Sequence, residues 1–80
     1  MSILNLTGRD RALLRAVAAG RCDITATGVP DLRVDGRWFC DQTRAHVLIA
    51  AGLLVRAGGT TPRVTPAGRA ALDEYERPAA

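Results

Sequence analysis

The chain has 80 residues, of which 48% are hydrophobic and 24% are charged, and its formal net charge is +3. This composition excludes a disordered or fibrous chain, and the length excludes two independent hydrophobic cores. The longest apolar run, residues 47–55, contains a glycine and falls far short of the roughly 20 residues that span a bilayer. Residues 1–6 lack the basic start of a secretory signal. We therefore expect a cytoplasmic protein with no membrane partner.

The basic charge consists entirely of arginine: all eleven basic residues are Arg and none is Lys. A GC-rich genome is the simplest cause, although the planar guanidinium group also suits phosphate and guanine recognition. The charge is unevenly distributed, with +3 in residues 41–69, neutrality in residues 21–40 and −2 in residues 70–80. This is a modest electrostatic footprint for a nucleic-acid partner, and it is centred on residues 41–69.

The first predicted element is an amphipathic helix over about residues 8–19. Thr7 and Asp10 approximate a capping box at its start, and Gly20 can supply the left-handed residue that ends it. Three apolar residues share one face of this helix: Leu13, Leu14 and Val17.

Residues 21–40 favour strands and turns over a helix. The pair Asp35-Gly36 is the strongest two-residue signal for a hairpin, and it places Arg33 opposite Trp38. The Arg33 guanidinium can then lie over the indole ring in a cation–π contact. We predict a β-hairpin in residues 21–40.

The second half predicts a helix, two short strands and a final helix. The first helix covers about residues 42–51, capped by an aspartate, and the strands occupy residues 53–56 and 63–65 around a Gly-rich turn. Thr65 then caps the last helix, and Pro66 stands at its first position, where a missing N–H costs nothing. The whole chain therefore predicts an α+β fold in which three helices pack with one small antiparallel sheet.

The segments "aGLLvR" and "vTPaGRaaL", at residues 51–56 and 64–72, resemble the ending of many bacterial winged-helix regulators. The MarR-like and PadR-like families are among them, and small actinobacterial and phage proteins contain similar sequence segments. The resemblance implies a winged-helix-like domain in residues 1–76, followed by a short tail at residues 77–80. In this domain the β-hairpin of residues 21–40 takes the place of the usual second helix of a helix-turn-helix. It further implies that the helix at residues 42–51 reads DNA and that residues 53–65 form a basic wing.

A polar stripe on the predicted reading helix adds to this interpretation. Its amide, hydroxyl and imidazole groups, with an arginine at the helix start, can contact base edges and phosphates, and arginines on the wing can anchor phosphates. The candidate DNA-binding residues are Gln42, Thr43, Arg44, His46, Arg56 and Arg63. We expect sequence-specific or accessory binding to double-stranded DNA, of the kind a transcriptional regulator performs. The same residues are also typical of a solvated helix surface.

A second interpretation is a non-enzymatic protein-interaction module on the same scaffold, such as a phage-encoded modulator of a host protein. The acidic C-terminal end and the modest charge favour it. A homodimer is also a candidate, with an interface formed by Ile3, Leu4 and Leu6 together with the last helix around Tyr75.

The sequence predicts neither enzymatic activity nor a cofactor. Cys22, Cys40 and His46 lack the paired spacing and the fourth ligand of a zinc site. His46 has no neighbouring nucleophile or carboxylate pair with which to form a catalytic site.

Overall fold

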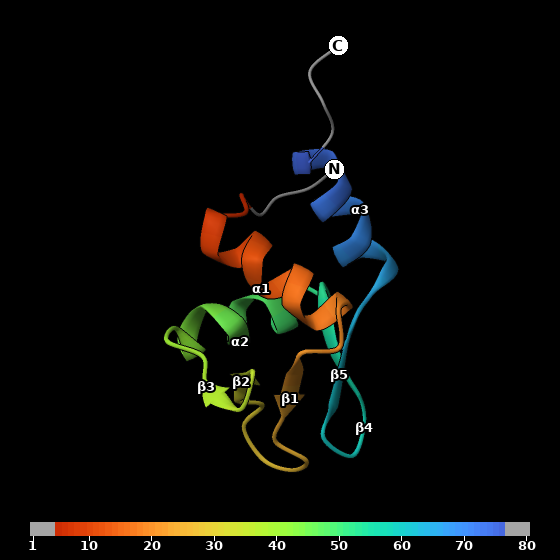
Figure 1. Cartoon of the computed structure of the whole chain (residues 1–80). Helices are drawn as coiled ribbons and strands as arrows, with labels where there is room; N and C mark the ends of the chain where they lie inside the picture. Colours follow the sequence, from red (N-terminus) through yellow and green to blue (C-terminus); the bar gives the residue numbers. More distant parts are fainter. Residues whose placement is uncertain (1–4, 77–80) are drawn as a thin grey trace.

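The structure, a computed structural model, describes residues 5–76. These residues form three helices and five strands in the order α1–β1–β2–β3–α2–β4–β5–α3 (Figure 1). The predicted tail at residues 77–80 lies outside the described residues, as do Ile3, Leu4 and the side chain of Tyr75 from the predicted dimer contact. Within residues 5–76 no helix has the length and apolar character that a bilayer crossing requires.

Helix α1 (Gly8–Ala18) begins at the predicted capping box. The Thr7 amide donates to Asp10 Oδ2 at 2.9 Å, and the Asp10 amide donates to Thr7 Oγ1 at 3.0 Å. Gly20 has a φ of 76°, the left-handed conformation expected of a residue that ends a helix. Both predicted boundary signals are confirmed, and the helix ends one residue before the predicted Ala19.

Residues 21–40 fold into a three-stranded antiparallel sheet instead of a helix. Its strands are β1 (Cys22–Ile24), β2 (Leu32–Val34) and β3 (Arg37–Trp38), in that spatial order. The predicted turn is confirmed, because Asp35 and Gly36 have φ values of 52° and 80° and join β2 to β3. Arg33 pairs with Trp38 as predicted, with its guanidinium carbon 5.5 Å from the indole centroid.

The second half contains the predicted helix, hairpin and helix: α2 (Gln42–Ala50), β4 (Leu54–Gly58), β5 (Thr61–Val64) and α3 (Pro66–Glu76). The hairpin strands extend closer to the turn than the sequence predicts. Gly58 pairs with Thr61 after a register shift, and Gly59 turns the chain with a φ of 54°. The Gly-rich segment therefore belongs largely to the ladder.

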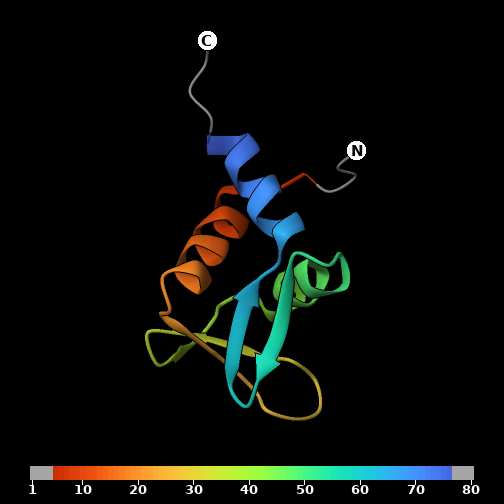
Figure 2. The same ribbon diagram turned by 90° about the vertical axis from the view of Figure 1, so that its right-hand side faces the viewer.

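The prediction of one antiparallel sheet is wrong, since the strands form two: β1–β2–β3 and β4–β5. A backbone hydrogen bond from the Ile24 amide to the Thr60 carbonyl, 3.0 Å long, links their neighbouring edges. The three-residue β1 and the turn position of Thr60 leave little length over which a continuous ladder could form. Figure 2 shows the β4–β5 hairpin standing across the first sheet, with α3 continuing from β5 beside α1.

The core lies between the helices and the inner faces of both sheets. Leu48 of α2 is fully buried, as its position on the apolar side of the helix predicts, and Leu6 is buried in the same core. Besides Leu48, the largest fully buried apolar side chains are leucines from α1, β2, β4 and α3: Leu13, Leu14, Leu32, Leu54 and Leu72.

Candidate nucleic-acid interface

Helix α2 begins where the sequence predicts, because the Asp41 carboxylate accepts a hydrogen bond of 3.1 Å from the Arg44 amide. Ala45 and Leu48 are buried against the core, whereas Thr43 and Ala50 are exposed. The exposed side of this helix therefore carries small side chains, and its longer polar side chains lie elsewhere.

Gln42 holds two segments of the first sheet together. Its Oε1 accepts from the Leu32 amide at 2.9 Å, and its Nε2 donates to the Leu32 carbonyl at 2.7 Å and to the Phe39 carbonyl at 3.0 Å. The side chain thus satisfies the backbone of Leu32 at the point where the pairing of the central strand β2 with β3 ends. The amide that the sequence assigns to base reading is fully engaged inside the protein.

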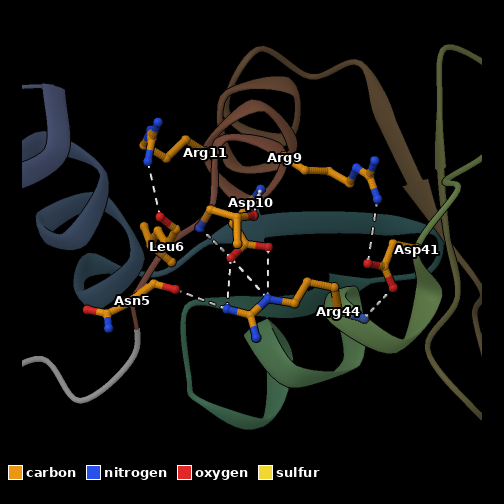
Figure 3. Close-up of polar contacts among 8 residues, drawn as sticks. Asn5, Leu6, Arg9, Asp10, Arg11, Asp41 and Arg44 are labelled. Carbon is orange, nitrogen blue, oxygen red and sulfur yellow. Dashed lines mark hydrogen bonds and ion pairs between the residues drawn. The ribbon is translucent and has the colours of Figure 1, made fainter.

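Arg44 reaches from α2 to α1 and binds the buried carboxylate of Asp10 (Figure 3). Arg44 also donates from Nη2 to the Asn5 carbonyl at 3.1 Å. Asp10 is 0% exposed, and burial alone would raise the pKa of its carboxyl; hydrogen bonds from Arg44 and Thr7 outweigh burial, so the pKa lies below its usual value. Arg44 is therefore neutralised by an internal partner.

From the sequence, Asp10 is predicted only as part of the capping box of α1, and its ion pair with Arg44 is not predicted. It lies three, four and seven positions before Leu13, Leu14 and Val17, so it shares their buried face. This spacing in the sequence indicates that Asp10 is buried, and a buried carboxylate needs a cationic partner.

His46 and Arg56 both contact the loop formed by residues 25–31, which joins β1 to β2. His46 Nε2 lies 2.9 Å from Asp31 Oδ1, and Arg56 Nη2 donates to the Gly28 carbonyl at 3.0 Å. The structure therefore brings these two predicted site residues to one segment, although they come from α2 and β4.

Arg63 lies on the outer face of the β4–β5 hairpin. Its cross-strand partner is Val55, and both side chains are exposed, while the neighbouring pair of Leu54 and Val64 faces inward. Among the described residues, Arg63 contacts no acidic side chain. Of the six predicted site residues, Thr43 and Arg63 thus have exposed side chains without an internal polar partner in this part of the chain.

All five acidic residues before the last helix are paired with a basic side chain. Asp10, Asp23, Asp31, Asp35 and Asp41 each lie within 4.0 Å of one, by the pairs Arg44–Asp10, Arg33–Asp23, His46–Asp31, Arg21–Asp35 and Arg9–Asp41. Within residues 5–74, four arginines have no acidic partner: Arg37, Arg56, Arg63 and Arg69. Three of these four belong to the hairpin β4–β5 and the start of α3.

The two cysteines are free thiols in different environments. Cys22 is buried in the core, and its burial raises the pKa of the thiol to about 11, whereas Cys40 is exposed. Burial therefore disfavours the thiolate of Cys22, which is the nucleophilic form of the side chain, at neutral pH.

Comparisons of the chain with protein-family models, with curated proteins and with solved structures find no match.

Proposed function

We propose that this chain is a DNA-binding domain of winged-helix type that contacts the DNA backbone chiefly through the β4–β5 hairpin. The order α2, hairpin, α3 supports the proposal, because in the families that the sequence resembles a wing follows the reading helix. The observation that carries the proposal is the difference between arginines that have an acidic partner and arginines that have none. Acidic partners neutralise Arg9 of α1 and Arg44 of α2, while Arg56, Arg63 and Arg69 have none among the described residues.

The geometry changes the expected roles of the α2 residues. Because Gln42 and Arg44 are bound internally, they are structural residues in this proposal. The exposed Thr43 remains for contacts with bases or phosphates, whereas the half-buried His46 already contacts Asp31. With so few groups for base reading and several for phosphate, weak sequence preference is expected. An accessory DNA-binding role fits this balance better than a highly selective one.

The test is fluorescence anisotropy with a random-sequence duplex across a salt series. Binding should weaken steeply with salt, with a slope of about −0.9 for each phosphate neutralised. Arg63→Ala should weaken binding similarly on all sequences and reduce the magnitude of that slope by about one. Arg37→Ala removes the same charge from the other sheet and should have a smaller effect. A wild-type protein without affinity at low salt, or equal losses in the two variants, would contradict the proposal.

One observation favours the protein-interaction alternative. Trp38 is 62% exposed on the outer face of the first sheet, where Arg33 lies over its ring. Tryptophan and arginine are the residues most enriched at the energetic centres of protein interfaces. If Trp38→Ala abolishes binding to a protein partner while the wild-type domain ignores DNA, this alternative replaces the proposal.

A further inference from the structure

The loop of residues 25–31 occupies basic groups that the proposed function needs. Arg56 donates to the Gly28 carbonyl and His46 contacts the Asp31 carboxylate, at 3.0 and 2.9 Å. In both contacts an oxygen atom of the loop faces a basic side chain, which is also how a phosphate oxygen would meet it. The loop therefore competes with any oxyanion that approaches α2 and β4 together.

The loop is closed on itself by Thr25. Thr25 Oγ1 donates to the Val29 carbonyl at 2.7 Å and accepts from the Asp31 amide at 3.1 Å. The Thr25 amide also donates to the Asp31 carbonyl at 3.0 Å. The hydroxyl and the backbone amide of Thr25 thus together close the loop that contacts Arg56, while most of the loop is exposed to solvent.

Arg56 differs from two other arginines in how it uses its guanidinium group. Arg21 and Arg44 each direct both Nε and Nη2 at the two oxygens of one carboxylate. Arg56 directs Nη2 at a single carbonyl oxygen, and its Nε is buried without a partner in the described part of the chain. A buried donor without an acceptor is unfavourable, and an acceptor with two oxygens would satisfy the whole edge.

We propose that the Nε–Nη2 edge of Arg56 is a phosphate-binding site that loop 25–31 covers in the free protein and uncovers when DNA binds. This inference rests on the proposed function. It adds that Arg56 is covered by the loop in the free protein and becomes accessible when DNA binds. The exchange replaces one carbonyl acceptor by a charged acceptor with two oxygens, and the released Gly28 carbonyl returns to water at an exposed position. The contact between His46 and Asp31 breaks only if the loop moves far enough to carry Asp31 away from the imidazole ring.

The first test compares wild-type protein with Arg56→Lys, which keeps the charge and removes the two-donor edge. The Nε–H resonance of Arg56 and the amides of residues 25–31 should shift together when a duplex is added to the ¹⁵N-labelled protein. Arg56→Lys should bind the duplex about tenfold more weakly with an unchanged melting temperature. Inorganic phosphate, added in place of chloride at constant ionic strength, identifies the source of the oxyanion. A shift with phosphate and none with duplex would overturn the assignment to DNA.

The second test loosens the loop without changing any charge. Thr25→Val removes the hydroxyl that closes the loop, so DNA affinity should rise by about threefold or more as the cover opens more often. Thr27→Val is the matched control in the same loop, because Thr27 is exposed and makes no side-chain hydrogen bond within the described residues. A merely structural role for Thr25 would lower stability and leave affinity unchanged or reduced.

The two proposals fail in different ways. A wild-type protein that binds duplex with a steep salt dependence, with no shift at Arg56 Nε and no gain from Thr25→Val, overturns the covered site and leaves DNA binding intact. If wild-type protein and Thr25→Val both ignore duplex at low salt, the proposed function fails, and the covered site fails with it.

Discussion

The guanidinium group of Arg44 binds the fully buried carboxylate of Asp10 along its whole side edge. Arg44 Nε lies 3.0 Å from each carboxylate oxygen, and Nη2 lies 2.9 Å from Oδ2. Asp10 also accepts the Thr7 amide, so one carboxylate both begins α1 and attaches it to α2. The relative position of the two helices therefore depends on a charged pair as well as on leucine packing.

Asp10→Asn should destabilise the fold by about 2–3 kcal/mol. Removing one partner of a buried pair leaves the other charge uncompensated, and the cost here is reduced because the Arg44 side chain is 26% exposed. Chemical denaturation followed by circular dichroism measures the change. Asp35→Asn is the control, since Asp35 pairs with Arg21 at the surface and asparagine suits its positive φ. If Asp35→Asn lowers the free energy of unfolding as much as Asp10→Asn does, the buried Asp10–Arg44 pair contributes no more to stability than a surface pair.

Acid should unfold the protein in a window set by Asp10. Its pKa in the folded protein lies below the ordinary value of 3.8, so the folded state is favoured by the ionised carboxylate. This stabilisation is fully present above the unfolded-state pKa and is lost as pH falls through the lower folded-state pKa. Asp35 contributes in the same direction, because hydrogen bonds from Arg21 lower its pKa. Urea midpoints measured at decreasing pH should fall in the wild type and fall less in Asp10→Asn.

Gln42→Glu should destabilise the first sheet and its attachment to α2, by about 1–3 kcal/mol. The substitution removes the amide that donates to the carbonyls of Leu32 and Phe39, and it places a carboxylate against both of them. Thr43→Glu introduces the same charge at the next, exposed position of the helix and is the control. Thermal melts that change equally in the two variants would indicate that Gln42 does not hold the sheet.

Gly68→Ala should be strongly destabilising because α3 approaches the chain before β4 closely at this point. A Cβ atom on Gly68 would overlap the Leu53 carbonyl oxygen and would lie 2.9 Å from a methyl group of Val64. Overpacking of this kind costs about 1–3 kcal/mol or more, since backbone must move. Gly58→Ala is the matched control, because a Cβ there meets nothing within 4 Å. A Gly68→Ala variant with an unchanged melting temperature would refute the close approach.

Local chemistry made the element boundaries predictable. The capping box at Thr7, the Asp35-Gly36 turn and the Thr65-Pro66 helix start each involve groups within a few residues, so no distant contact is needed to choose the conformation. The apolar spacing that predicted Leu48 as a core residue has the same local origin. These signals were sufficient for the helices, for the hairpin in residues 21–40 and for the α+β class.

The tertiary structure decided which polar side chains remain available to a partner. The sequence by itself placed Gln42 and His46 on a polar stripe and Arg44 at the start of the same helix. It did not indicate their internal partners, which lie 10, 34 and 15 residues away from Gln42, Arg44 and His46 respectively. Buried polar and charged groups must find partners as the core forms, and those partners come from wherever the topology brings backbone or carboxylate oxygens. The packing of loop 25–31 against α2 and β4 gives Arg56 an acceptor for Nη2 and none for Nε. Arg63 remains exposed on the outer face of the hairpin. Neither outcome can be inferred from the sequence around these residues.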